Sequence, residues 1–171
     1  WFVANICTWE WNNQTDLGKS FAESVAEKVA EYPEWETEIR MYWERWEDML
    51  NGEVPGMKEW ICELKNAGYK VYGLSNWSHE TFPMVKDKYE AFGMMDGIVM
   101  SGQELIAKPD LRIYKILLER YELKAEECVF IDDRKENIEA GEQVGIRGII
   151  FENCEQAKQA FHVLNKKSNE Y

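Results

Sequence analysis

The pattern of apolar and polar residues divides the chain into two parts. From its start to about residue 50, apolar and aromatic positions recur at helical spacing. A capping-box sequence over residues 20–23 starts one predicted helix, which ends before Pro33. A second predicted helix covers residues 35–50 and ends at Asn51-Gly52. The first part is therefore expected to be helical.

From about residue 53 the pattern alternates between short apolar runs and segments of helical periodicity. Pro55 starts a helix that Gly68 ends, and the polar tail from Asn165 to Tyr171 is expected to fray. The repeated strand, helix, strand order predicts parallel pairing with right-handed crossovers, which is a Rossmann-like α/β sheet. The predicted strands cover residues 69–74, 97–100, 129–131 and 146–151, and the later predicted helices cover residues 80–90, 110–121, 136–144 and 155–164.

The change of pattern near residue 52 marks the predicted domain boundary. A helical domain is expected over residues 1–51 and an α/β core over residues 52–171. Of the chain's eight tryptophans, all but Trp60 and Trp77 precede this boundary. The two parts therefore differ in composition as well as in periodicity.

Composition excludes several classes of partner. The formal net charge of −12 and the isoelectric point of about 4.7 argue against a surface for nucleic acid or anionic membrane. No apolar run is long enough to span a membrane. The four cysteines are widely spaced without a C-x-x-C pair, which favours neither a disulfide framework nor a zinc site. A cytoplasmic protein is predicted.

Two neighbouring acids, Asp132 and Asp133, follow the apolar run Val129 to Ile131. In open α/β sheets, ligands bind beyond the carboxyl ends of the strands. Adjacent carboxylates repel each other, and a cation, a lysine or a proton relieves that repulsion. Because these ligands are oxygen atoms only, the best-suited metal is Mg²⁺.

Polar groups end two other predicted strands or follow them closely. Ser75-Asn76 follows the strand at residues 69–74, and Lys108 lies in the loop after the strand at residues 97–100. A hydroxyl and a backbone N–H can hold phosphate oxygens, a lysine can neutralise a phosphoryl group, and carboxylates can hold Mg²⁺ beside it. The combination predicts phosphoryl-transfer chemistry, but none of these residues is an evident nucleophile.

Three segments, in this order, resemble motifs of the haloacid dehalogenase-like hydrolases. VYGLSN at residues 71–76 is similar to the second motif of that superfamily, AKPDLRIY at residues 107–114 to the third, and VFIDDRKEN at residues 129–137 to the acidic fourth. The resemblance spans almost the whole chain. It is to the subgroup with a helical cap inserted after the first strand, which implies that residues 1–51 form that cap.

The resemblance implies roles for individual residues. Asp133 would be a direct Mg²⁺ ligand and Asp132 a direct or water-mediated one. Ser75, with the backbone amide of Asn76, would bind the phosphoryl group, and Lys108 would bridge that group and the nucleophile. Asn137 matches a position that often carries an acid and would support the metal ligands without touching the metal. Trp77, directly after Ser75-Asn76, is expected near the substrate.

The first motif of the family has no counterpart in this chain. That motif supplies the nucleophilic aspartate and the general acid, and it would precede Trp1, which is itself not a methionine. The corresponding strand would lie centrally, between the strands that end in the second and fourth motifs. Its absence predicts a fragment of a longer protein, or a strand supplied by another chain.

The leading functional hypothesis is a Mg²⁺-dependent phosphatase that acts on a small phosphate ester through an aspartyl-phosphate intermediate. A metal-independent 2-haloacid dehalogenase is an alternative, although dehalogenases usually lack the acidic pair that Asp132-Asp133 forms here. An inactive binding protein or fragment is the other alternative. His79 is expected to be structural, and Trp9 or Trp11 is a candidate wall of a substrate pocket under the cap.

Overall fold

The computed structural model describes residues 1–168, and side chains as far as residue 165. The first fifty residues form helices, as predicted. Thr8 and Ser20 cap the second and third helices, each accepting a hydrogen bond from a backbone N–H three residues on. The elements are α1 (Phe2–Asn5), α2 (Trp9–Asp16), α3 (Phe21–Glu31), the 3₁₀ turn η1 (Pro33–Trp35), α4 (Glu36–Glu44) and the 3₁₀ turn η2 (Trp46–Met49).

The prediction of one continuous helix over residues 35–50 was wrong. Helix α4 ends at Glu44, and η2 follows after Arg45, whose backbone leaves helical geometry. The break separates two aromatic residues of the apolar face. Trp43 packs with the helical segment, whereas Trp46 turns toward Trp77, with ring centroids 6.5 Å apart. Packing of Trp46 against a residue remote in sequence outweighs the local helical pattern.

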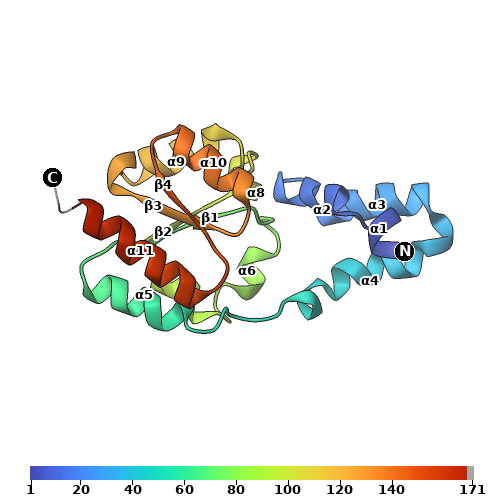
Figure 1. The fold of residues 1–171 in the computed structure, drawn as a ribbon. Helices are drawn as coiled ribbons and strands as arrows, with labels where there is room; N and C mark the ends of the chain where they lie inside the picture. Colours follow the sequence, from blue (N-terminus) through green and yellow to red (C-terminus); the bar gives the residue numbers. More distant parts are fainter. Residues whose placement is uncertain (169–171) are drawn as a thin grey trace.

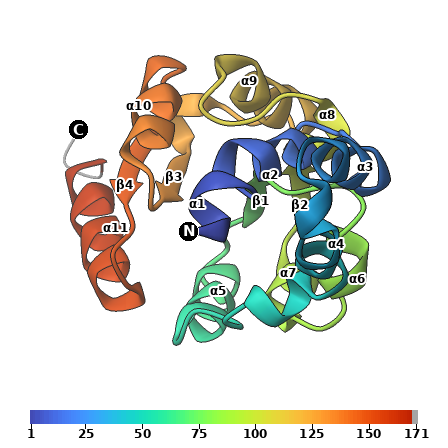
Figure 2. The ribbon, with the colours of Figure 1, turned by 90° about the vertical axis from the view of Figure 1, so that its right-hand side faces the viewer.

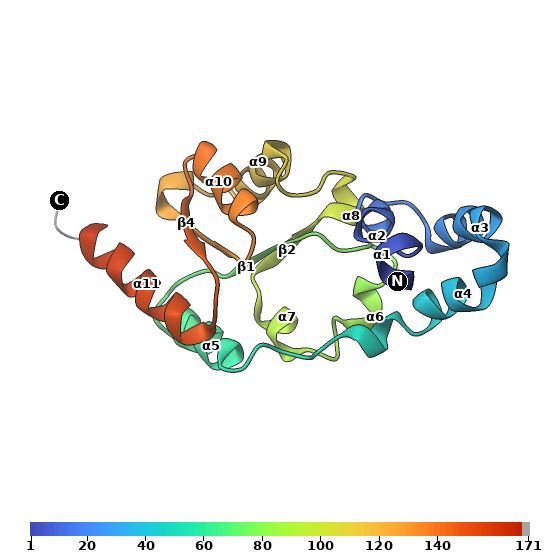
Figure 3. The same ribbon diagram turned by 45° about the vertical axis from the view of Figure 1, so that its right-hand side comes forward.

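The helical segment has an apolar core of its own. Ile6, Cys7, Trp11, Val25 and Ile39 are buried together in it. The Trp11 indole donates to the carbonyl of Ser24 over 3.2 Å, so its polar N–H is satisfied. Figures 1 and 3 show these helices at one end of the molecule and α11 at the other.

The rest of the chain alternates helices and parallel strands, which confirms the Rossmann-like α/β prediction. Helices α9 and α10 lie on one side of the strands, and α5 and α11 lie on the other (Figure 1). The elements are α5 (Met57–Asn66), β1 (Tyr72–Ser75), α6 (Phe82–Val85), α7 (Glu90–Met94), β2 (Gly97–Met100), α8 (Ser101–Glu104), α9 (Leu111–Arg120), η3 (Ala125–Glu127), β3 (Val129–Asp132), α10 (Lys135–Gln143), β4 (Arg147–Ile150) and α11 (Cys154–Ser168).

Several boundaries differ from the predictions, and among the strands β1 begins at Tyr72 and not at residue 69. Helix α5 begins at Met57, because Gly56 adopts a positive φ of 82° and interrupts the chain after Pro55. The predicted helix at residues 80–90 is two short helices, α6 and α7, separated by an extended Tyr89. Helix α11 continues to Ser168, past its predicted end at residue 164, and residues 169–171 of the predicted tail lie outside the described residues.

The strands form two parallel pairs. Strand β1 pairs with β2 so that Ser75 aligns with Met100, and β3 pairs with β4 so that Asp132 aligns with Ile150. Within residues 1–168, β1 and β3 do not pair with each other. Figure 2 shows β3 and β4 beside α10 and α11, apart from β1 and β2. Strands β1 and β3 therefore each keep one edge without a partner strand in the described chain.

The α/β core packs beneath α9 and α10. Leu74 of β1 and Val99 of β2 meet Ile113, Tyr114 and Leu117 of α9. Their burial orients the strands so that the polar residues at the ends of β1 and β3 come next to the loop that carries Lys108. None of the helices within residues 1–168 is long and apolar enough to cross a membrane.

Candidate functional site

A buried ion pair joins two of the predicted site residues. The Lys108 Nζ lies 2.7 Å from Asp132 Oδ2, and the two side chains are 9% and 7% exposed. The same ammonium donates to the carbonyl oxygen of Leu74 over 2.6 Å. Lys108 therefore links the carboxyl ends of β1 and β3, two strands that share no backbone hydrogen bond.

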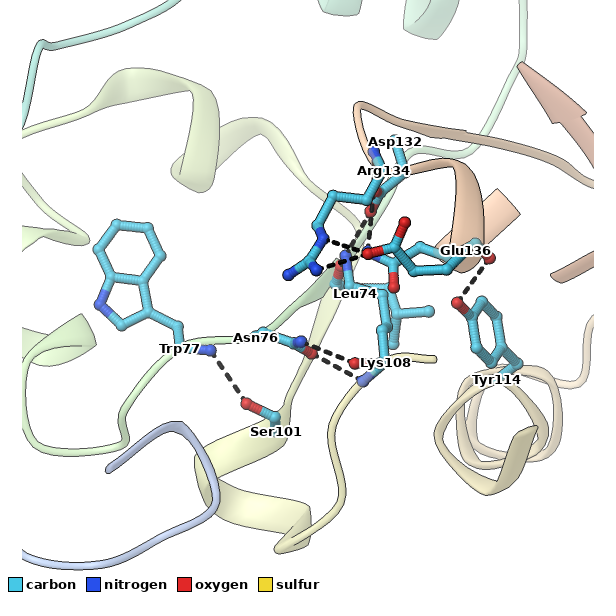
Figure 4. Close-up of polar contacts among 10 residues, drawn as sticks. Leu74, Asn76, Trp77, Ser101, Lys108, Tyr114, Asp132, Arg134 and Glu136 are labelled. Carbon is cyan, nitrogen blue, oxygen red and sulfur yellow. Dashed lines mark hydrogen bonds and ion pairs between the residues drawn. The ribbon is translucent and has the colours of Figure 1, made fainter. Parts of the chain in front are cut away.

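The other carboxylate oxygen of Asp132 accepts two hydrogen bonds. The backbone N–H of Arg134 and the Asn137 amide group each donate to Oδ1 over 2.9 Å. The backbone carbonyl of Asn137 in turn accepts from the Tyr114 hydroxyl of α9 over 2.7 Å. Figure 4 shows this chain of contacts from α9 to Lys108. Asp132 is thus held in one orientation by donors from several elements.

Asn76 positions the backbone of Lys108. Its amide group donates to the Lys108 carbonyl over 3.0 Å, and its side-chain oxygen accepts from the Lys108 N–H over 2.8 Å. These two reciprocal hydrogen bonds hold the loop after β1 against the loop before α9 (Figure 4). The structure therefore brings together Asn76, Lys108, Asp132 and Asn137 in one network.

Ser75 and Trp77 lie beside this network. Ser75 is the half-buried last residue of β1. The Trp77 N–H donates to Ser101 Oγ over 3.0 Å, and its indole donates to Thr81 Oγ1 over 2.9 Å. In Figure 4 the indole of Trp77 points away from Lys108. Trp77 therefore follows Asn76 directly in the sequence, but its ring packs against Trp46 and points away from Lys108.

Asp133 differs sharply from Asp132. It is exposed, and it makes no hydrogen bond or ion pair within the described chain. Its carboxylate is therefore free to take a cation. Residues 1–168 contain no group of three or more histidine, cysteine or acidic side chains arranged to hold a metal. Mg²⁺ commonly binds through one or two carboxylates and completes its shell with water and phosphate oxygens. The neighbouring carboxylates of Asp132 and Asp133 fit this requirement.

Gly102 allows the loop that follows Asn76 to approach α8 closely. A Cβ atom at this position would lie 2.6 Å from the His79 nitrogen and 2.7 Å from the Trp77 oxygen, both of the backbone. We expect Gly102→Ala to lower the free energy of unfolding by about 1–3 kcal/mol, because the backbone has to move.

Urea denaturation would measure the effect of Gly102→Ala. Gly93→Ala is the matched control, because nothing lies within 4 Å of a Cβ there and Gly93 is in helix α7. That control is expected to be neutral or slightly stabilising. If Gly102→Ala were as stable as the unmodified protein, the loop would not be held closely against α8.

The helical segment contacts the acidic loop directly. The Arg134 guanidinium lies 4.9 Å from the centre of the Trp9 ring, and it also pairs with Glu136. Of the two tryptophans considered for a pocket wall, Trp11 lies in the helical core and Trp9 lies over Arg134. Neither of them lines the cavity that lies between the helical segment and the loop after β1.

A cavity of roughly 230 Å³ lies between the helical segment and the loop after β1. Asn76 and Trp77 line it from one side, and Asp16 of α2 lines it from the other. Burial raises the pKa of Asp16 from 3.8 to about 6, and a hydrogen bond from the backbone of Ser78 partly offsets this effect. The sequence pattern did not single out Asp16, because one acid at a helix end is an ordinary surface feature.

Comparison with known proteins identifies the family. Residues 5–145 match the haloacid dehalogenase-like hydrolases. The chain belongs to this family. A sesquiterpene phosphatase of Aspergillus oryzae is 33% identical over 93 residues, covering 54% of this chain and 47% of the relative. Flavin mononucleotide hydrolase 1 of Arabidopsis thaliana is 24% identical over 102 residues, covering 60% and 41%. The chain thus spans about half or less of the length of these relatives.

Solved structures of haloacid dehalogenase-like enzymes share the fold. The magnesium complex of a HAD family enzyme from Bacteroides thetaiotaomicron superposes with a TM-score of 0.75 at 19% identity, covering 93% of this chain and 84% of that one. A predicted HAD-like hydrolase from Porphyromonas gingivalis gives 0.73 at 19% identity, covering 95% and 82%. The Rossmann-like parallel architecture is therefore that of the family.

Proposed function

We propose that the whole protein is a Mg²⁺-dependent phosphatase that acts on a small phosphate ester. The observation that carries this proposal is the buried contact between Lys108 and Asp132, with the exposed, unpaired Asp133 directly beside it. A fixed ammonium and a free carboxylate at the carboxyl ends of β1 and β3 suit a phosphoryl group and the cation that accompanies it. The sesquiterpene phosphatase relative supports phosphate chemistry.

Each residue has a separate task in this proposal. Asp133 holds Mg²⁺ directly, and Asp132 holds it directly or through water while Asn137 keeps the Asp132 carboxylate oriented. Ser75 and the backbone N–H of Asn76 bind phosphoryl oxygens. Lys108 neutralises charge on the same group. When bound, Mg²⁺ would offset the negative charge that develops on the phosphoryl oxygens.

The nucleophile in this proposal is an aspartate on a further strand, placed between β1 and β3. Support comes from the unpaired edges of these two strands and from Lys108, which spans their ends. The aspartate oxygen bonds to phosphorus as the ester P–O bond breaks, and the leaving alkoxide takes a proton from a general acid of the same strand. Water then releases inorganic phosphate and restores the carboxylate.

We assign residues 1–51 to a helical cap over residues 52–171. The separate apolar core of the helical segment supports this division, as does the cavity between that segment and the loop after β1. A cap of this kind would exclude water from the reacting phosphoryl group. Trp77 would then contact the organic part of the substrate, because it lines the cavity while its N–H is fixed by Ser101.

Two alternatives remain in competition with the phosphatase. A dehalogenase-type reaction has no use for the acidic pair, so the presence of Asp132-Asp133 weighs against it. A binding protein without activity would need no nucleophile at all. The acidic pair favours phosphate chemistry over both the dehalogenase and the binding protein.

Hydrolysis of a generic aryl phosphate would test the proposal. The assay compares the present chain with one extended at its N-terminus, each with Mg²⁺ and with EDTA. The extended chain is expected to turn over only with Mg²⁺, and the present chain is expected to be inactive because the proposed nucleophile belongs to the further strand. Robust activity of the present chain would refute the assignment of the nucleophile to a further strand. Inactivity of both chains would favour the binding protein, and EDTA-insensitive dehalogenation by the extended chain would favour the alternative enzyme.

A further inference from the structure

The cavity between the helical segment and the loop after β1 is lined by apolar and uncharged polar side chains and by a single acid, Asp16. Trp46 and Leu50 contribute apolar surface, and Asn76 and Trp77 close the other side. Asn76 belongs both to this cavity and to the hydrogen-bond network around Lys108, since its side chain also pairs with the backbone of Lys108. A molecule in this cavity would therefore lie next to the proposed phosphoryl site.

Asp16 is the one acid among the side chains that line this cavity. Within the described chain it forms no ion pair, it is only partly exposed, and it accepts a hydrogen bond from the backbone N–H of Ser78. Burial of an acid without a cation penalises the charged form, which agrees with the raised pKa of about 6. The carboxylate is nevertheless the charged form at neutral pH, so one strong hydrogen-bond acceptor faces a space lined by both aromatic and polar side chains.

The size of the cavity limits its occupant. An apolar cavity of about 150 Å³ is large enough for benzene. A space of roughly 230 Å³ holds a ring with a short substituent, and the aromatic wall suits its flat faces. Asp16 already accepts from the backbone N–H of Ser78, and the remaining lone pairs of its carboxylate can accept from a donor group on a ligand.

We propose that this cavity binds the organic part of the phosphate ester as a ring-sized apolar group bearing a hydroxyl or ammonium, and that Asp16 accepts the hydrogen bond from that donor. This inference rests on the proposed phosphatase function and adds the substrate class. Asp16 is then a specificity-determining residue, located on the helical segment and not in any of the three motifs.

The test compares Asp16→Asn with the unmodified sequence in the N-terminally extended protein. Two substrates are used, phenyl phosphate and 3-(aminomethyl)phenyl phosphate, which differ by one donor group. The unmodified protein is expected to show at least tenfold higher kcat/KM for the amine-bearing substrate. Asp16→Asn is expected to remove that preference by raising KM for this substrate alone, with kcat unchanged. Asp87→Asn is the control, because Asp87 is exposed and does not line the cavity.

Binding of the product phenols keeps the inference separate from the phosphatase proposal. Trp46 and Trp77 line the cavity, so their fluorescence reports occupancy by phenol or 3-(aminomethyl)phenol whether or not any ester is hydrolysed. Preferential binding of the amine, lost in Asp16→Asn, would support the inference even if turnover were absent. Equal binding of both phenols by the unmodified protein would overturn it, as would an equal loss for both in the variant.

Thermal stability separates a role in specificity from a structural one. The pKa of Asp16 is raised in the folded protein, so its stabilising protonation is complete below pH 3.8 and is lost as the pH rises through about 6. At pH 7.5, Asp16→Asn removes a buried charge and is expected to raise the melting temperature. A clear fall in melting temperature would show that the carboxylate is structural and would contradict the proposal.

Discussion

Replacing Lys108 by methionine is expected to abolish phosphate-ester hydrolysis in the N-terminally extended protein and to lower the free energy of unfolding by about 3–5 kcal/mol. The ammonium lies 2.7 Å from Asp132, and both side chains are buried. Without it, the carboxylate keeps two hydrogen-bond donors but loses its cation, and an uncompensated buried charge is costly. Urea denaturation and an aryl phosphate assay would measure the two effects.

The double variant Lys108→Met with Asp132→Asn separates stability from catalysis. It removes both charges, and the side-chain oxygen of the introduced asparagine could still accept from Arg134 and Asn137. Most of the lost stability is therefore expected to return while activity stays absent. If Lys108→Met alone had the stability of the unmodified protein, the buried ion pair would not be a structural contact. Retained turnover would remove Lys108 from the phosphoryl site.

Asp133→Asn is expected to reduce Mg²⁺-dependent turnover at least a thousandfold in the extended protein, with a change in unfolding free energy within about 0.5 kcal/mol. The residue is exposed and has no partner in the described chain, so folding does not depend on its charge. Calorimetric titration with Mg²⁺ would report the loss of the metal ligand independently of turnover.

A matched comparison sharpens the Asp133 prediction. Asp87→Asn removes one exposed carboxylate outside the acidic loop and is expected to keep both turnover and Mg²⁺ binding. Unchanged turnover in Asp133→Asn would exclude Asp133 from the site. A large loss of stability would show instead that Asp133 has a structural role, contrary to its exposed position.

The sequence predicted the elements whose local signals agree with their packing. The strand at residues 97–100 was predicted with the bounds that the structure has, and the helix after Ser20 follows its capping box. The aromatic-rich residues 35–50 show the limit. Their periodicity predicts one helix, but Trp46 packs on Trp77, and the chain breaks at Arg45 to allow it. Contacts between residues far apart in sequence leave no mark on local periodicity.

For the candidate site, the sequence predicted the approximate position of the residues but not the contacts between them. Ser75, Lys108 and Asp132 could be placed near one sheet edge, because parallel strands bring their carboxyl ends together. The functional roles assigned to them stay predictions, as does the domain boundary at residue 52. The reciprocal bonds between Asn76 and Lys108 could not be foreseen, since they depend on the path of two loops.

The sequence by itself determined the family, the parallel α/β class and the order of the polar groups, because motifs and hydrophobic periodicity are local properties of the chain. Only the tertiary structure decided that Asp132 is buried against Lys108 while its neighbour Asp133 is free in solvent. It alone placed Asp16 across a cavity from Asn76 and Trp77. Burial and pairing decide the chemistry of a carboxylate, and both are set by residues remote in sequence.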